Sequence, residues 1–287
     1  MASQNTNRPL EGKLALVTGA SRGIGEAISH NLASKGASLI LNYTSPSSAE
    51  LCNELSKTLS SNYNVKCLVI QADMGMPTGP TQIIQKAKSH FTDSTGNFQI
   101  NILINNAGVS RNLKIEECTI EDWEWQYRIN VLGPLLLMQA ALLYLPHDRS
   151  GRIVNISSVS SSEGFKMQSV YGGTKAALEA MTRTWSRELS ERATVNAVNP
   201  GPVKTDMWGG TTDEFQKHLK PWIEKTPGSK IRKEIDDEDL VRDEERAGGR
   251  PAYTKEIAGV VGMLCLEDAL WCTGQVVCAN GGMRMAF

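Results

Sequence analysis

Short apolar runs alternate along this chain with longer segments in which apolar residues recur at helical spacing. The runs are rich in Val, Ile and Leu and contain few polar positions, which is typical of strands that are buried on both faces of a sheet. After the first run, Ile24, Ile28 and Leu32 lie at helical spacing, and Lys35–Gly36 provides the end of a helix. The pattern predicts strands at 13–18, 38–43, 65–73, 100–106, 152–158, 194–200 and 274–280, and helices at 24–35, 47–60, 81–91, 119–145, 169–190 and 255–267.

Strands and helices that alternate in this way imply a parallel sheet with helices on both faces. The sequence therefore predicts an α/β fold with a single Rossmann-like, doubly wound sheet, and one domain over 1–287. Only the segment 201–251 departs from this rhythm, because it is irregular and carries the charge-rich run 230–246. A charge-rich run is commonly a solvated helix or a disordered loop, whereas a long insertion in a compact domain often covers an active site. We expect 201–251 to be a substrate loop or lid.

The composition excludes several classes of protein. The 287 residues carry a formal net charge of −1 with both signs interspersed, so the sequence lacks a basic surface for nucleic acid or anionic lipid. It shows no apolar secretory leader and no apolar run of roughly 18 residues, the length that crosses a bilayer. The six cysteines contain no C-x-x-C pair and the four histidines stand alone, which argues against a disulfide framework and a metal site. These features predict a cytoplasmic protein that acts on a small molecule.

The stretch TGASRGIG, at 18–25, places three glycines between the first predicted strand and the first predicted helix. Gly19 permits a tight turn, Gly23 lets the backbone approach a phosphate, and Gly25 lets the helix pack closely on the strand. A helix that begins here directs its free N–H groups and the positive end of its dipole toward a pyrophosphate. The spacing is G-x-x-x-G-x-G, without the lysine of a P-loop. The stretch therefore predicts a dinucleotide site.

Further polar clusters follow the ends of later predicted strands. NNAG lies at 105–108, NISS at 155–158 and NPGPVKTDM at 199–207. Tyr171 and Lys175, four residues apart on a predicted helix, share one helix face. Because the carboxyl ends of parallel strands meet at one edge of a sheet, we expect these clusters to converge on one crevice.

Together and in this order, these motifs resemble the classical short-chain dehydrogenase/reductase family, close to its 3-oxoacyl-carrier-protein reductase and tetrahydroxynaphthalene reductase types. The resemblance extends over 11–283 apart from the long loop. In that family a serine precedes the catalytic tyrosine by thirteen residues, which selects Ser158 relative to Tyr171. Lys175 matches the family's lysine, and Asn130 in NVLG matches its catalytic asparagine. The resemblance thus implies an NADP(H)-dependent reductase of ketones, or a dehydrogenase of the corresponding alcohols.

Carbonyl reduction explains why these residue types are needed. Hydride delivery to a ketone builds negative charge on its oxygen, so Ser158 would hydrogen-bond that oxygen and Tyr171 would also donate the proton. A phenol has a reference pKa of about 10, and we expect the charge of Lys175 to lower it. The resemblance adds that Lys175 holds the nicotinamide ribose and that Asn130 anchors a water which resupplies the proton.

We expect the cofactor to be NADP(H) rather than NAD(H). An NAD enzyme commonly carries Asp or Glu after the second strand for the ribose 2′-hydroxyl, but here Tyr43 occupies that place. Arg22 can pair with a 2′-phosphate, and Thr44 and Ser45 can donate hydrogen bonds to it. The resemblance places Asp73 at the adenine. The full predicted cofactor site is Gly19, Ser21, Arg22, Gly23, Ile24, Gly25, Tyr43, Thr44, Ser45, Asp73, Met74, Asn106, Ala107, Gly108, Tyr171, Lys175, Pro200, Gly201, Val203 and Thr205.

For the substrate, we expect a bulky, largely apolar ketone. Val203 and Thr205 match family positions that touch the nicotinamide, so the segment 208–250 starts beside the reacting carbon. As part of a mobile lid, Trp208 and Phe215 would contact the substrate together with Ser158 and Tyr171, while the charged stretch that follows faces water. Alternatively, these rings pack a helical insertion onto the core or onto a partner subunit.

Two other functions stay open. The fold could serve a regulatory protein that binds NADP(H) without chemistry, although the complete catalytic set argues against it. The chain could also be a non-redox biosynthetic enzyme, such as a cyclase or dehydratase. Family habit favours a role in biosynthetic or secondary metabolism and a homo-oligomer, a tetramer or dimer, built on the two long central helices.

Overall fold

A parallel sheet forms the centre of the molecule and sets the position of the predicted site. In the computed structural model, which describes residues 8–285, seven strands lie in the order β3-β2-β1-β4-β5-β6-β7. They are β1 (Leu14–Val17), β2 (Ser38–Tyr43), β3 (Cys67–Gln71), β4 (Ile102–Asn105), β5 (Gly151–Ile156), β6 (Ala193–Pro200) and β7 (Val276–Ala279). Every strand predicted from the sequence forms, so the doubly wound fold is confirmed. The strand order reverses between β1 and β4, and a sheet of this kind leaves a crevice at the carboxyl ends of its strands there.

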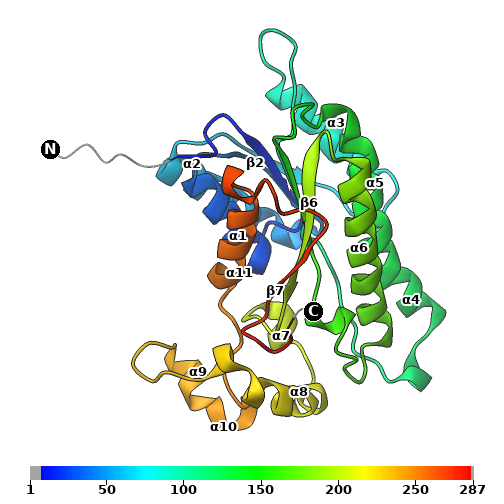
Figure 1. Cartoon of the computed structure of the whole chain (residues 1–287), viewed down its shortest axis with the longest axis vertical. Helices are drawn as coiled ribbons and strands as arrows, with labels where there is room; N and C mark the ends of the chain where they lie inside the picture. The colour runs from blue at the N-terminus through cyan, green and yellow to red at the C-terminus, as the bar shows by residue number, and fades with distance from the viewer. Residues whose placement is uncertain (1–7, 286–287) are drawn as a thin grey trace, which may run out of the picture.

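Helices cover both faces of the sheet (Figure 1). One face carries α1 (Gly23–Ser34), α2 (Ala49–Tyr63) and α11 (Thr254–Leu264), and the other carries α3 (Gly79–Phe91), α4 (Ile120–Tyr127), α5 (Gly133–Ala141) and α6 (Ser169–Glu188). Val17 and Leu41 belong to the core on the α1 side, whereas Leu16 and Ile40 belong to the core on the α5 side. Because successive side chains of a strand point to opposite faces, the continuous apolar runs fill two cores at once.

The segment 119–145, predicted as one long helix, is divided in two. α4 ends at Tyr127, and a π-helical turn (η3, Arg128–Leu132) joins it to α5. Pro134 at the start of α5 has no N–H, so the carbonyl of Asn130 lacks the partner that a continuous α-helix would supply. The helical stretch predicted over 119–145 therefore forms, with a π-helical turn in its middle that contains the predicted catalytic residue Asn130.

The segment after β6 is largely helical, which corrects the expectation of an irregular loop. It forms α7 (Asp206–Gly209), α8 (Asp213–Lys225), α9 (Glu238–Arg242) and α10 (Glu244–Ala247), and Figure 1 shows α8, α9 and α10 grouped together at one end of the molecule. Thr212 caps α8 by accepting a hydrogen bond from the N–H of Phe215. The interior Pro221 and the dense charges explain why the sequence pattern did not predict α8. We call 201–251 the substrate segment below.

Candidate active site

A cavity of about 790 Å³ runs along the carboxyl ends of the strands, from the glycine-rich turn to α8. All the cofactor residues predicted from the sequence line it, and so do Ser158, Trp208 and Phe215. The side chain of Asn130 is buried behind this lining and is only 1% exposed. The fold thus brings together groups that are far apart in the sequence, as the strand-end pattern predicted.

The glycine-rich turn requires glycine at each of the three predicted positions. Gly19 and Gly23 both have φ of +62°, in the left-handed region that other residues rarely adopt. A Cβ on Gly25 would lie 2.2 Å from the carbonyl oxygen of Gly19. The Asn106 side chain holds the turn, because its Nδ2 donates to the carbonyls of Thr18 (2.8 Å) and Gly19 (3.1 Å). The N-terminus of α1 consequently faces the cavity, where it can receive phosphate groups.

The end of β2 carries no carboxylate. Tyr43 ends this strand, and Thr44 and Ser45 line the cavity beyond it. Arg22 reaches across the cavity mouth to Asp206 of α7, with Nη1 3.3 Å from the carboxylate, and both side chains are exposed. An exposed pair of this kind is weak, so the guanidinium is available to exchange Asp206 for a phosphate.

Tyr171 and Lys175 lie one turn apart on α6, facing the cavity. The Nζ of Lys175 donates to the carbonyl of Ile156 at the end of β5 (2.9 Å) and lies 5.7 Å from the centre of the Tyr171 ring. Ser158 follows the end of β5, and its hydroxyl is hydrogen-bonded to Ser160 Oγ at 3.1 Å. Serine, tyrosine and lysine therefore meet in one place, with the spacing that the sequence predicted.

Burial controls the ionisation of this pair. Burial raises the pKa of Tyr171 to about 12, although a hydrogen bond with Ser158 opposes this. Burial lowers the pKa of Lys175 to about 8, although the charge of Glu179 opposes this. Loss of hydration is the larger influence on the pKa of Tyr171 in the free protein, and the lowering expected from the charge of Lys175 stays a prediction. The phenol is a proton donor at neutral pH.

Asn130 ties the wall of the site together. Its Oδ1 accepts from the N–H of Val109 (2.9 Å), while its Nδ2 donates to the carbonyl of Val109 (2.8 Å) and to Thr174 Oγ1 (3.1 Å). The carboxamide is thus fully used between the strand-end loop and α6. Since Pro134 cannot donate to the carbonyl of Asn130, that backbone oxygen is the group which remains for a water molecule.

A chain of polar side chains continues from Ser158 into the substrate side of the cavity. Ser160 Oγ donates to Gln168 Oε1, and Gln168 Nε2 donates to Asn112 Oδ1 at 3.0 Å. Ser110 Oγ donates to the same oxygen at 3.3 Å. All of these residues line the cavity. Sequence reasoning missed them, because none of the four belongs to a motif, including Gln168, which lies three residues before Tyr171.

The apolar side of the cavity comes from the substrate segment. Phe215 is 2% exposed and packs with Val159 and Phe165, yet it also lines the cavity. Trp208 lines the cavity next to it and is partly buried. Trp222 packs edge-on against Phe165, with ring centres 5.6 Å apart. The rings therefore do both things that the sequence left open: they pack α8 onto the core and they form a wall of the site.

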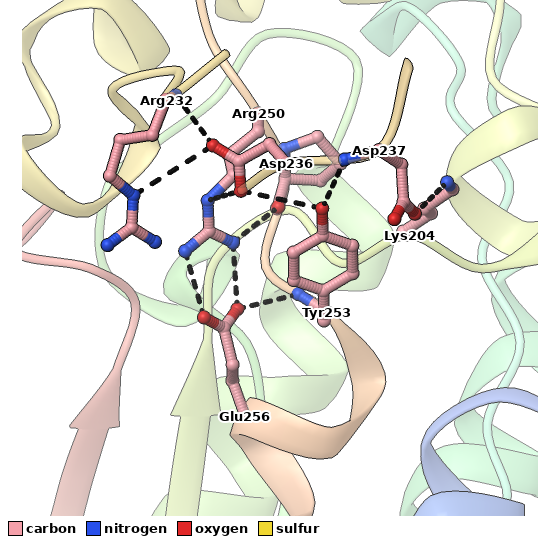
Figure 2. A network of polar contacts seen from close by, with 8 residues as sticks. Lys204, Arg232, Asp236, Asp237, Arg250, Tyr253 and Glu256 are labelled. Carbon is pink, nitrogen blue, oxygen red and sulfur yellow. Dashed lines mark hydrogen bonds and ion pairs between the residues drawn. The ribbon is translucent and has the colours of Figure 1, made fainter. Parts of the chain in front are cut away.

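The base of the substrate segment is held by buried ion pairs, as Figure 2 shows. The carboxylate of Asp236 is fully buried and lies 3.3 Å from Arg250 Nε. Arg250 also donates two hydrogen bonds of 2.8 Å to Glu256 on α11. These bonds raise the pKa of Arg250 and lower the pKa of Glu256. The expectation that the charged stretch simply faces water is therefore wrong for Asp236, because Arg250, which lies beyond that stretch, compensates its buried charge.

Residues 8–285 contain neither a membrane-spanning helix nor a cluster of metal-binding side chains. No helix there has the length and apolarity needed to cross a bilayer. No group of three or more His, Cys, Asp or Glu side chains in that range is arranged to hold a metal ion.

With this geometry in place, the class of protein is defined by comparison with known proteins. The family model described as short chain dehydrogenase matches residues 13–215. The chain belongs to this family, which confirms the resemblance, and it is an oxidoreductase that acts on CH–OH and C=O groups.

Individual relatives narrow the comparison. The chain is 54% identical to an L-xylulose reductase from Aspergillus niger, over 97% of this chain and 99% of the relative. It is 48% identical to an L-xylo-3-hexulose reductase from Hypocrea jecorina, with the same two coverages. Among solved structures, a blue fluorescent protein from a metagenomic library in complex with NADPH superposes with a TM-score of 0.80 and 31% identity, over 96% of this chain and 100% of that one.

Proposed function

We propose that this enzyme uses NADPH to reduce the carbonyl group of an open-chain polyhydroxy ketone, a ketose, to an alcohol. The observation that carries the proposal is the row of hydrogen-bonding side chains beside Ser158 and Tyr171, which comprises Ser110, Asn112, Ser160 and Gln168. A ketose presents a hydroxyl group on almost every carbon, and each buried hydroxyl needs a partner. The relatives named for L-xylulose and L-xylo-3-hexulose reduction support this substrate class.

The residues fit the cofactor. A turn in which a side chain on Gly25 would collide with Gly19, followed by the free N-terminus of α1, suits a pyrophosphate. Arg22, Thr44 and Ser45 would hold the 2′-phosphate and favour NADP(H) over NAD(H). When bound, NADPH supplies the hydride that the carbonyl carbon receives.

The protein's own groups serve the carbonyl oxygen. Tyr171 donates its phenolic proton to that oxygen as negative charge develops there, and the Ser158 hydroxyl donates a hydrogen bond to it. The ammonium of Lys175 stabilises the phenolate that remains, and it also holds the ribose next to the nicotinamide. The backbone carbonyl of Asn130 positions a water that returns a proton toward Lys175 and Tyr171. In alcohol oxidation the same groups act in reverse order.

This substrate class replaces the expectation of a bulky, apolar ketone. An apolar ketone would leave Asn112, Gln168 and Ser160 buried under a surface that offers them no hydrogen bonds, which is costly. Trp208 and Phe215 then face the C–H side of the carbon chain, as apolar walls do in sugar-binding sites with one polar and one apolar side.

The test is an NADPH-oxidation assay on the purified protein with L-xylulose, L-xylo-3-hexulose and a bicyclic aromatic ketone as substrates. The proposal predicts higher kcat/KM for the two ketoses than for the aromatic ketone. A higher kcat/KM for the aromatic ketone would indicate that the substrate is a bulky, apolar ketone instead. If no ketone supports NADPH oxidation, the result would favour a non-redox enzyme or a regulatory NADP(H)-binding protein.

We also infer one domain over the whole chain, a cytoplasmic location and a homo-oligomer. Large apolar side chains are exposed on α4 and near α5, where Trp123 is 49% and Leu143 81% exposed, and separately after α11, where Trp271 is 99% exposed. Two separate apolar faces suit a tetramer with two kinds of interface. Light scattering on the purified protein measures the subunit number, and a monomer at micromolar concentration would contradict this inference.

A further inference from the structure

Glu179 is a buried carboxylate that the mechanism above does not use. It lies on α6 one turn after Lys175, and it is 9% exposed. Three donors converge on its Oε1: Ser157 Oγ at 2.6 Å, Ser161 Oγ at 2.7 Å and Asn199 Nδ2 at 3.2 Å. None of these donors is charged. Such an arrangement suits an ionised carboxylate, which accepts hydrogen bonds and donates none.

The three donors enclose the turn that carries Ser158. Ser157 precedes Ser158 directly, and Ser161 closes the short helical turn η5 (Val159–Ser161) that follows it. Asn199 on β6 also donates to the carbonyl of Ser158 at 3.0 Å. Glu179 Oε1 therefore accepts hydrogen bonds from both ends of the turn and from the neighbouring strand. These bonds fix the turn and with it the position of the Ser158 hydroxyl.

The charge of Glu179 acts on a site in which one cation is buried. It lies one helical turn from Lys175 on α6, and its charge also reaches Cys278 on β7. The nearby Arg284 pairs with Glu163 at 3.3 Å, so these two charges largely cancel each other. Burial lowers the pKa of Lys175, and the charge of Glu179 is the influence that opposes it.

We propose that Glu179 is a positioning residue for the carbonyl reduction. It fixes the turn that presents Ser158, and its charge keeps Lys175 in the ammonium form on which Tyr171 depends. This inference rests on the proposed function for its place in the reaction, but the ionisation of Lys175 tests it independently.

The experiment uses Glu179→Gln, which keeps an oxygen acceptor and removes the charge. Because a nearby negative charge favours retention of protons by Lys175 and Tyr171 together, its loss lets the pair release its first proton at lower pH. In a plot of kcat against pH, ketone reduction falls at high pH and alcohol oxidation rises there. In Glu179→Gln both of these transitions move down by about one pH unit, the size expected for a unit charge one helical turn away. In the protein without substrate or cofactor, the NMR titration of the Lys175 Cε carbon, assigned with Lys175→Arg, moves in the same direction.

Two control variants separate charge from packing. Glu163→Gln removes a carboxylate that is partly exposed and paired with the partly exposed Arg284, so water screens the change in charge and the pH profiles and the Lys175 titration move less than in Glu179→Gln. Ser161→Ala removes one donor but no charge, so it lowers kcat several-fold without moving the two transitions. Glu179→Asp keeps the negative charge, so its pH dependence of kcat matches that of the parent enzyme.

The inference is overturned if Glu179→Gln is folded and its Lys175 titration matches that of the parent protein. It is equally overturned if Glu163→Gln moves that titration as far as Glu179→Gln does. If no ketose is reduced by the parent enzyme, the proposed substrate class fails, while the NMR titration still decides the role of Glu179.

Discussion

Two buried carboxylates support the two walls of the cleft in opposite ways. Asp236, at the base of the substrate segment, lies 3.3 Å from the buried guanidinium of Arg250, so its charge is neutralised where it stands. Glu179, on the buried side of α6, accepts from hydroxyl and amide donors only, so its charge remains available to act on Lys175. An arginine partner neutralises a buried carboxylate, which then stabilises the fold. Neutral donors leave the negative charge uncompensated, so it shifts the pKa values of nearby groups. Substitutions on the α6 side of the cleft should therefore lower the reaction rate, whereas substitutions at the base of the substrate segment should lower the free energy of unfolding.

The largest effect is expected for Tyr171→Phe. The ring keeps its packing while the proton donor is lost, so kcat for ketone reduction should fall by about a thousandfold, within the range of acid catalysis. Cofactor affinity, measured by NADPH fluorescence, and the melting temperature should stay close to the parent values. Tyr144→Phe removes a phenol away from the cleft and serves as the control. Retention of most of the activity by Tyr171→Phe would identify another group as the acid.

The substrate segment should give the largest loss of stability, with Arg250→Met. This change removes the buried cation beside Asp236 and leaves only the Arg232 N–H and the Tyr253 hydroxyl as hydrogen-bond donors to it, which costs about 3–5 kcal/mol of unfolding free energy. Lys204→Met is the matched control, because it breaks the exposed pairs with Asp237 and Asp239 and should cost about 0–1 kcal/mol. Denaturant unfolding measures both. Equal stability of the two variants would mean that Asp236 is solvated and does not anchor the segment.

Arg22 lies where the cofactor end of the cleft meets the substrate segment. Arg22→Ala should weaken NADPH binding by about tenfold to thirtyfold, because a hydrogen-bonded charge on the 2′-phosphate is lost. NADH, which has no 2′-phosphate, should bind as before. A fluorescence titration with both cofactors checks this, and an equal loss for NADH would assign Arg22 to the pyrophosphate or to the fold.

Gln168, at the start of α6, faces the substrate from the polar wall. Gln168→Leu keeps the volume and removes hydrogen bonds to substrate hydroxyls, so KM for a ketose should rise by about fivefold to tenfold. An apolar ketone should be affected less, and the ratio of kcat/KM for the two substrates measures the change. A uniform loss with both substrates would show that Gln168 supports Ser158 rather than the ketose.

The smallest effect concerns acid stability. The hydrogen bonds from Arg250 lower the pKa of Glu256 in the folded state. The stability that this interaction contributes is therefore present above the unfolded pKa of Glu256 and is lost as pH falls through the folded one. Unfolding free energy should drop less steeply with acid in Glu256→Gln than in the parent protein. Identical slopes would mean that Glu256 does not contribute.

Much of the cofactor side could be predicted from sequence because its causes are local. A left-handed φ at Gly19 and Gly23 requires glycine wherever the chain folds, and the strand-end clusters share an edge in any parallel sheet. All predicted cofactor residues line the cavity as a result. Asn130 is the exception among the predicted site residues: Pro134 marks the π-helical turn, but only the folded structure shows that the Asn130 side chain is buried behind the cavity lining.

The seven apolar strands, the glycine turn and the spacing from Ser158 through Tyr171 to Lys175 could all be predicted from the sequence, because each depends on residues close together in the chain. Only the tertiary structure decided which charges are buried. Asp236 and Asp237 are adjacent acidic residues, yet Asp236 is buried against Arg250, whereas Asp237 is exposed and pairs with Lys204. Glu179 is likewise indistinguishable from a surface glutamate until β6 and the Ser158 turn close over it. Burial of a charge is set by partners that are distant in sequence, and folding alone brings them within hydrogen-bonding distance.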